Sequence, residues 1–127
     1  MPTLFERIVA GELPCHKVWE DDEHFAFLDI APRVEGHTLV IPKQATDYLF
    51  DLDEAATAKL WGAARRVAVH LKEQLGCERV CVAVLGYEVP HCHVHLLPTN
   101  SLHDFPFPPV DAAAKSRLSE TAARLAP

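Results

Sequence analysis

Three histidines in one short segment are the residues whose type and spacing most clearly allow chemistry. His91, His93 and His95 alternate with apolar residues within the stretch 90–98. Alternate side chains of a β-strand emerge on the same face. A strand over 91–97 would therefore place the three imidazoles in one row, and Cys92, Val94 and Leu96 would point toward the core on the other face. A single histidine is usually structural or solvated, but an ordered row indicates a reactive surface.

Nucleophilic attack on phosphorus is the chemistry that such a row supports best. A neutral imidazole nitrogen can form a covalent intermediate, which divides one difficult transfer into two easier steps. An imidazole with an ordinary pKa of about 6.5 is unprotonated often enough at neutral pH to attack. Neighbouring histidines can bind phosphate oxygens or pass a proton to the leaving group. Because His93 has a histidine on each side, the spacing predicts that His93 is the nucleophile.

A metal site is the main alternative for this segment, since histidines two residues apart on a strand can supply two ligands. The α-carbons of His91 and His95 would stand about 13 Å apart at ~3.3 Å per residue, whereas bonds to zinc are ~2.0 Å long. Two of the three could share a metal with a third ligand such as His37. Neither a cysteine pair nor an HExxH-type sequence supports that arrangement, so we expect no metal and no cofactor.

The elements that position these histidines can be predicted from hydrophobic periodicity. The surest is a helix over 54–75, whose apolar residues fall on one side of a 3.6-residue wheel. Asp51 or Asp53 can cap its start, and Gly76 can end it. This helix supplies the largest apolar face in the chain and is expected to cover the sheet.

The other expected elements are short. They are a helix at 3–10 that Thr3 caps and Gly11 ends, a hairpin at 16–30 with an acidic turn, strands at 37–41 and 79–85, and a helical tail at 110–125. Strands grouped around one long helix predict an α+β domain with an antiparallel sheet of about five strands. At 127 residues the chain is expected to be a single domain, 1–127.

Composition and charge argue against several classes of protein. The chain has 12 Lys and Arg against 18 Asp and Glu, a formal net charge of -6, so binding to a nucleic-acid polymer is not expected. Its apolar runs are far shorter than the ~20 residues of a membrane span, and its start lacks the pattern of a secretory signal. The four cysteines show no CxxC spacing and are expected to be reduced thiols. We therefore expect a cytoplasmic protein with no membrane partner.

The histidine segment resembles the motif of the histidine triad (HIT) superfamily of nucleotide hydrolases and transferases. Residues 91–97 fit its pattern of His-apolar-His-apolar-His-apolar-apolar. Further stretches follow in the order seen in the Hint-like branch of that superfamily, namely residues 5–14, 19–22, 26–32 and 36–43. The resemblance covers roughly residues 3–100 and leaves 101–127 as a C-terminal extension.

This resemblance implies a HIT-like fold, usually in a homodimer, and cleavage of P–N or P–O bonds in AMP or GMP conjugates through a nucleotidyl-histidine. His93 would be the nucleophile, His95 and His91 the other triad members, and His37 a fourth family histidine behind the site. Asp29 would hold the ribose hydroxyls. The purine base would lie in an apolar slot formed by Phe5, Ile8, Phe27 and Ile30.

Each of these binding residues also has a purely structural interpretation. Asp29 could cap the turn before Pro32, because aspartate is common in turns. His37 could be a buried structural histidine. The four apolar residues of the expected slot could simply be part of the core, as periodic apolar residues usually are.

The segment before the first histidine departs from the family pattern. Many relatives carry a longer glycine-rich stretch with a hydroxyl that holds the phosphate. Here, residues 85–90 offer Gly86 and, where the hydroxyl often stands, Glu88. A carboxylate repels a phosphate unless it is protonated or paired, but it can bind a cationic leaving group such as the amine of a phosphoramidate. We therefore expect a purine nucleoside phosphoramidase or related hydrolase. The alternatives are a dinucleoside polyphosphate hydrolase and a non-catalytic nucleotide-binding dimer.

Overall fold

The sheet that carries the histidine segment has five antiparallel strands. In the computed structural model, which describes residues 1–127, these are β1 (Lys17–Glu20), β2 (His24–Leu28), β3 (Thr38–Pro42), β4 (Arg79–Ala83) and β5 (Val94–Thr99). Their order across the sheet is β1-β2-β3-β5-β4, so β5 inserts between β3 and β4. The predicted α+β fold with about five antiparallel strands is confirmed.

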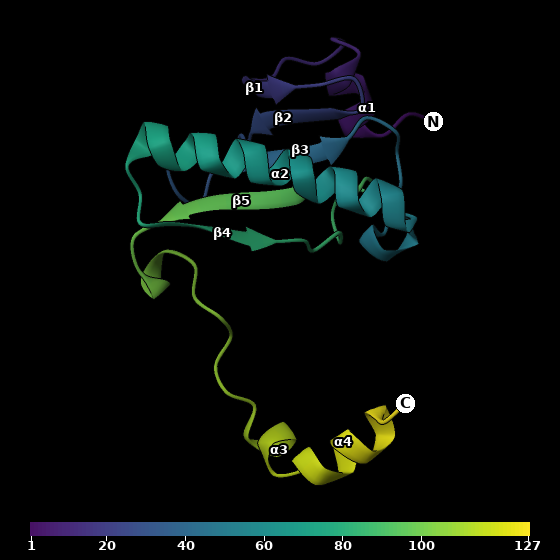
Figure 1. Ribbon diagram of the computed structural model, residues 1–127, viewed down its shortest axis with the longest axis vertical. Coiled ribbons are helices and arrows are strands. Elements are labelled where there is room, and N and C mark those ends of the chain that lie inside the picture. The colour runs from purple at the N-terminus through teal and green to yellow at the C-terminus, as the bar shows by residue number, and fades with distance from the viewer.

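Helix α2 (Glu54–Leu75) covers one face of this sheet (Figure 1). Its bounds are those predicted, and Asp53 rather than Asp51 is the cap, because the Asp53 side chain accepts the N–H of Ala56. Asp51 instead ends a short 3-10 turn, η1 (Leu49–Asp51). The helix and the strands meet in one apolar cluster that includes Ala26, Val40, Leu60, Ala64, Val67, Leu71, Val94 and Leu96.

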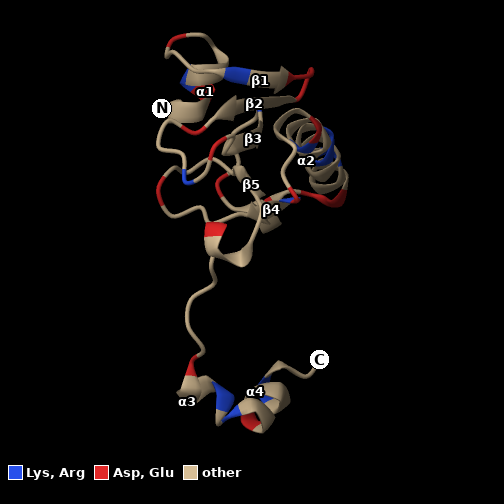
Figure 2. Ribbon diagram, turned by 90° about the vertical axis from the view of Figure 1, so that its left-hand side faces the viewer, with Lys and Arg blue, Asp and Glu red and all other residues tan.

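The opposite face of the sheet is covered at one end by helix α1 (Leu4–Val9). Figure 2 shows α1 and α2 on opposite sides of the strands. Alternate strand residues point to this side, and Phe25, Phe27, Leu39 and Ile41 form a second apolar cluster with Phe5 of α1. Thr3 is the predicted N-cap of α1, and it forms a capping box with Glu6.

The histidine strand begins later than the alternation of its residues predicts. β5 starts at Val94, so His95 alone of the three lies within the sheet. In the β3–β5 register Pro42 would lie opposite Cys92. Proline has no N–H to donate to the ladder, and the Cys92 N–H donates instead to the Thr46 carbonyl at 2.6 Å. The predicted alternation of faces holds, because Cys92 packs in the cluster under α2 and the histidines lie on the other side.

The chain continues beyond the sheet as an arm, residues 106–127, that stands away from the rest of the protein (Figure 1). Every residue of the arm is exposed. The helix predicted over 110–125 is divided into α3 (Ala112–Lys115) and α4 (Leu118–Leu125). Ser116 lies between them, and its hydroxyl donates to the Ala113 carbonyl at 2.8 Å, a local bond that competes with the helical pattern. None of the helices has both the length and the apolar character that a membrane crossing needs.

Candidate active site

The four histidines expected at the site lie together beside the starts of β3 and β5. The ring centroids of His93 and His95 are 5.0 Å apart, and those of His37 and His95 are 5.1 Å apart. The Phe5 ring of α1 lies against His91 and His93, at centroid distances of 5.6 and 5.0 Å. Two segments that are distant in the sequence therefore form one cluster of imidazoles, and the Phe5 ring of a third packs against it.

His91 is completely buried, and both of its ring nitrogens are engaged. Nε2 lies 2.7 Å from the Pro42 carbonyl oxygen, which can only accept, so Nε2 carries the ring proton and donates it. Nδ1 lies 2.7 Å from the Thr3 hydroxyl and accepts its proton. Burial lowers the pKa of His91, which keeps the ring neutral. The His91 ring therefore has no free nitrogen for a substrate, and it acts on the site through its own backbone.

His93 presents one unprotonated nitrogen. Its Nδ1 lies 2.7 Å from the His91 carbonyl oxygen, so in the neutral ring Nδ1 holds the proton and Nε2 holds the lone pair. The residue is 7% exposed. No buried polar side-chain atom of the protein lacks a hydrogen-bond partner, and Nε2 has none, so this nitrogen reaches the surface. The ring also stands nearly perpendicular to the Phe5 ring, at 82°, which fixes its orientation.

His95 and His37 form a chain of hydrogen bonds behind His93. The Arg33 N–H donates to His37 Nδ1 at 3.1 Å, so the His37 proton is on Nε2. That nitrogen donates to His95 Nδ1 at 2.9 Å and lies 3.6 Å from Asp29 Oδ2. Burial, reinforced by His93 and His37, lowers the pKa of His95 to about 4. At neutral pH His95 is therefore uncharged and offers its Nε2–H as a donor beside His93.

Asp29, His37 and His95 are the residues whose positions could suit a metal ion, because their ligating atoms lie within 4.8 Å of one another. A metal at this point would need the lone pair of His37 Nε2. The Arg33 N–H occupies Nδ1 of that ring, which leaves the proton on Nε2. The three residues are thus arranged as a hydrogen-bonded chain, and a metal could bind only after that chain had been broken.

The apolar residues expected to hold a purine are divided by the structure. Phe5 and Phe27 are buried with their ring centroids 5.4 Å apart, and Ile8 packs against the same cluster. Ile30 is 88% exposed and lies outside that cluster. The structural interpretation therefore applies to Phe5 and Phe27 as core residues, while the Phe5 ring also contacts the histidines.

Asp29 has the turn contact that its residue type suggested, and it also faces the site. Its Oδ1 accepts the Ala31 N–H at 2.9 Å, which holds the bend after β2. Its Oδ2 is the oxygen that lies near His37. Because the side chain is 21% exposed, this carboxylate remains open to a ligand hydroxyl.

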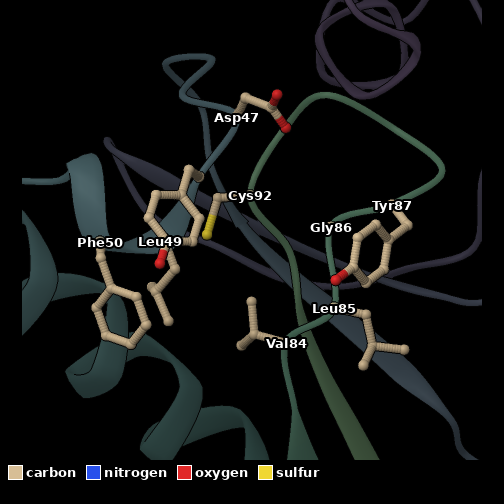
Figure 3. A pocket seen from close by; sticks show the side chains of 9 residues that line it. Asp47, Leu49, Phe50, Val84, Leu85, Gly86, Tyr87 and Cys92 are labelled. Atoms are coloured by element: carbon tan, nitrogen blue, oxygen red, sulfur yellow. The ribbon is translucent and has the colours of Figure 1, made fainter. Parts of the chain in front are cut away.

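Gly86 and Glu88 make no hydrogen bond to the four histidines. Gly86 has a φ of 82° and, with Tyr87, Cys92 and residues 47–50, lines a hollow of about 220 Å³ (Figure 3). The Cys92 side chain faces the opposite side of its segment from the histidines, so this hollow is separate from their cluster. Glu88 is exposed, and neither a hydrogen bond nor an ion pair holds its carboxylate.

Three groups that shape the site were not predicted from the sequence: the Thr3 hydroxyl, the Pro42 carbonyl and the Arg33 N–H. Thr3 was predicted only as a helix cap. The other two are backbone groups, a carbonyl and an N–H, and such groups are not tied to one residue type. No sequence signal could have identified those two, and the Thr-x-x-Glu spacing at residues 3–6 was the one available signal for the first.

The fold and the site together define an α+β protein with a candidate histidine nucleophile. The free Nε2 of that histidine, His93, lies among three further histidines. Residues 10–102, which include the whole sheet and all four histidines, match the family model described as the HIT domain. The chain belongs to the HIT family, as its motif implied.

Two relatives illustrate the extent of the similarity. The chain is 35% identical over 102 residues to an uncharacterised HIT-like protein of Borreliella burgdorferi, which covers 75% of this chain and 73% of that one. It is 33% identical over 103 residues to the adenosine 5'-monophosphoramidase hnt1 of Schizosaccharomyces pombe, which covers 77% of this chain and 74% of the yeast protein.

Solved structures share the fold. The crystal structure of a HIT family member from Bacillus subtilis has a TM-score of 0.82 and 25% identity, and the match covers 100% of this chain and 99% of that one. A HIT-like protein from Bartonella henselae, crystallised with an unknown ligand, matches with a TM-score of 0.72 and 31% identity over 76% of this chain and 79% of that one.

Proposed function

We propose that the protein is a nucleotide hydrolase or transferase that acts on the α-phosphate of purine nucleotides through a nucleotidyl-histidine, and that its reaction is phosphoramidase-like. The observation that carries this proposal is the state of His93. Its Nδ1–H is held by the His91 carbonyl at 2.7 Å, and its Nε2 lone pair reaches the surface without a partner. A nucleophile needs such a fixed and unprotonated nitrogen.

In the first step the Nε2 lone pair of His93 forms an N–P bond with the α-phosphorus. The bond from phosphorus to the leaving group breaks, and its electron pair leaves with that group, which takes a proton from solvent. The His93 ring becomes positively charged as the bond forms, and the His91 carbonyl that accepts Nδ1–H stabilises this charge. In the second step water attacks the phosphorus and loses a proton to solvent, the N–P bond breaks, and its electron pair returns to Nε2.

His95 supports this reaction as a hydrogen-bond donor. Because its pKa is about 4, the His95 ring is almost entirely neutral at pH 7. The protonated ring that could act as an acid toward a leaving group is therefore rare. The Nε2–H of the neutral ring can instead bind a phosphoryl oxygen as negative charge develops there. The chain from the Arg33 N–H through His37 keeps the proton of His95 on that nitrogen.

Phosphoramidates suit this chain better than polyphosphates as substrates. Glu88 is an exposed carboxylate in the segment that leads to His91. It would attract the cationic amine released from a phosphoramidate and repel the anionic group released from a dinucleoside polyphosphate. The yeast relative named as an adenosine 5'-monophosphoramidase is consistent with this preference. Asp29 and the apolar cluster around Phe5 are proposed to hold the ribose and the purine.

The test is covalent trapping with adenosine 5'-phosphoramidate labelled in its phosphate. Wild-type protein should form an acid-labile adduct on His93 and release AMP. His93→Ala should form no adduct and lose activity by at least about a thousandfold, as expected for removal of a nucleophile. His70→Ala, which removes an exposed histidine of α2, is the matched control and should behave as wild type.

Other outcomes would select another function. Tight binding of AMP without an adduct would identify a non-catalytic nucleotide-binding protein. Faster turnover of diadenosine polyphosphates than of the phosphoramidate would identify a dinucleoside polyphosphate hydrolase. Equal turnover by wild type and His93→Ala would exclude the histidine mechanism.

We also propose that the protein works as a homodimer in the cytoplasm. β4 lies at the edge of the sheet with one side unpaired, and its Val82 is 46% exposed. An unpaired edge with an apolar side chain is a surface that a second copy can cover. Four free cysteines, two of them buried, are typical of a reducing compartment. Sedimentation should give twice the 14.1 kDa mass of the chain.

A further inference from the structure

The Thr3 hydroxyl makes two hydrogen bonds that join helix α1 to the histidine segment. Its oxygen accepts the Glu6 N–H at 3.1 Å, as the N-cap of α1. The same oxygen lies 2.7 Å from His91 Nδ1, a nitrogen that carries no proton because Nε2 donates to the Pro42 carbonyl. A hydroxyl has one proton and two lone pairs. Thr3 can therefore donate to His91 while it accepts from Glu6.

We propose that Thr3 is a positioning residue for the nucleophile: its hydroxyl holds the buried His91 ring, and through it the His91 carbonyl that keeps the proton of His93 on Nδ1 and the lone pair on Nε2. This inference rests on the proposed function, in which His93 Nε2 attacks phosphorus. Thr3 touches no reacting atom and acts only through its neighbours.

The His91 ring depends on Thr3 because nothing else can satisfy Nδ1. The ring is 0% exposed, so water cannot replace a lost hydroxyl without a rearrangement of the segment. A buried acceptor that loses its partner carries the full cost of desolvation. The ring would relieve that cost by rotating or by changing its protonation. Either change disturbs the residue whose carbonyl lies 2.7 Å from His93 Nδ1.

Helix α1 provides a second path from Thr3 to the nucleophile. The helix has six residues and is far below the ~12–15 residues at which an isolated helix becomes marginally stable. It carries Phe5, whose ring packs against both His91 and His93. The bond from Thr3 to His91 ties the start of this helix to the histidine segment, and so it keeps the Phe5 ring beside His93.

Three substitutions separate this positioning role from simple capping of the helix. Thr3→Val keeps the shape of the side chain but has no hydroxyl. Thr3→Asp can still cap the helix as an acceptor, but its carboxylate has no proton to donate to His91. Glu6→Ala removes the other half of the capping box, the 2.9 Å bond from the Thr3 N–H, and leaves the bond from Thr3 to His91 in place.

The first measurement is ¹⁵N NMR of the histidine rings in the full chain, which reports which nitrogen carries each proton and needs no substrate. Wild type should show His91 protonated on Nε2 and His93 protonated on Nδ1. Thr3→Val should shift both His91 Nδ1 and the His93 ring signals. Thr3→Asp should move His91 Nδ1 to the protonated range. Thr3→Ser should restore the wild-type pattern, and Glu6→Ala should keep it.

The second measurement is the single-turnover rate of adduct formation from adenosine phosphoramidate. Thr3→Val and Thr3→Asp should slow this rate by about tenfold or more, with little change in the substrate concentration at half-maximal rate. Thr3→Ser and Glu6→Ala should stay within about twofold of wild type. Glu6→Ala should nevertheless melt at a lower temperature, since it weakens the helix cap.

The two measurements distinguish failure of this inference from failure of the proposed function. If the His93 ring signals and the adduct rate of Thr3→Val and Thr3→Asp equal those of wild type, Thr3 only caps α1 and the positioning role is wrong. If Glu6→Ala slows the adduct as much as Thr3→Val does, helix stability is the cause, and the positioning role is again wrong. If wild type itself forms no adduct, the proposed function fails, and the NMR result still decides whether Thr3 holds the His91–His93 pair.

Discussion

The body of the protein, residues 1–105, and the arm, residues 106–127, contain the same kinds of residue in opposite surroundings. Leu96 of β5 is 0% exposed, whereas Leu118 of α4 is 65% exposed. Helix α2 buries its apolar stripe against the sheet, whereas every residue of α3 and α4 faces solvent. The hydrogen bonds differ in the same way. Those of the buried histidines in the body join residues that are distant in the sequence, whereas the side-chain bonds of Asp111 and Ser116 in the arm reach only three residues along the chain.

This difference shows what an amphipathic pattern can and cannot predict. Periodic apolar residues indicate a helix in both regions. In the body, the strands lie beside α2, so the apolar face of the helix packs against the apolar face of the sheet. In the arm, Pro106, Pro108 and Pro109 have no backbone N–H, and the segment that contains them leads the chain away from the sheet (Figure 1). The partner of an apolar face is therefore decided by the path of the chain.

The largest effect on stability is expected from Leu96→Ala in the body. The side chain is completely buried in the cluster between α2 and the sheet. Removal of such a side chain leaves a cavity and should lower the free energy of unfolding by about 2–5 kcal/mol. Urea denaturation of the full chain measures this change. A loss below about 1 kcal/mol would mean that the cluster is loosely packed.

A smaller effect is expected from Gly36→Ala, at the turn that leads to His37. Gly36 has a φ of 84°, and a Cβ there would overlap the Leu75 side chain and lie 3.1 Å from Pro98 Cγ. Strain and crowding should together cost about 1–2 kcal/mol. The matched control is Gly62→Ala in α2, where a Cβ meets nothing within 4 Å and should stabilise the helix by up to ~1 kcal/mol. A neutral result at Gly36 would show that Leu75 moves aside freely.

Acid should weaken the body through its buried histidines, and the arm contains no histidine. The pKa of His95 is about 4 in the folded protein, lowered from 6.5 by burial and by the neighbouring histidines. Between these two values the unfolded chain binds more protons, so the free energy of unfolding falls as the pH drops from about 6.5 to about 4. Burial lowers the pKa of His37 and His91 as well, in the same direction.

Each of these rings contributes at most about 1.4 kcal/mol per pH unit. Urea midpoints measured between pH 7 and pH 4.5 test this expectation, and His95→Asn should reduce the slope. A midpoint that stays constant over this range, in both proteins, would contradict the burial of the neutral rings.

The smallest effect is expected from Leu118→Ala in the arm, the counterpart of Leu96→Ala. Because the side chain is already exposed, its removal should change the free energy of unfolding by no more than about 0.5 kcal/mol. Denaturation at two protein concentrations measures this. A larger loss that depends on concentration would show that a second copy covers the arm in solution and would remove the contrast between the two regions.

Much of the fold could be predicted because its signals are local. The helix over 54–75 has an N-cap at Asp53 and a C-cap at Gly76, and its apolar residues repeat with the period of a helix. The prediction of the strand that carries the histidines was less accurate, since the start of that strand depends on Pro42 of a neighbouring strand. The arm was predicted as one helix and forms two, because nothing packs against it to overcome the local bond at Ser116.

The histidine row is similarly divided between local and distant causes. The spacing of His91, His93 and His95 was sufficient to predict that they share a face and that His93 is central. The hydrogen-bond partners of the His91 ring were not predictable, because they lie 88 and 49 residues away, at Thr3 and Pro42. Ile30, which was expected to line an apolar slot, is exposed beside the bend that Asp29 holds, and its place in that slot stays a prediction.

The sequence by itself determined that imidazoles would be concentrated on one side of a sheet, because strand geometry converts a spacing of two residues into a shared face. Only the tertiary structure decided which nitrogen of each ring holds a proton. A carbonyl accepts and an N–H donates, so the protonated nitrogen of an imidazole is set by whichever backbone group the fold places beside it. That placement leaves a free lone pair on His93 and none on its neighbour two residues before.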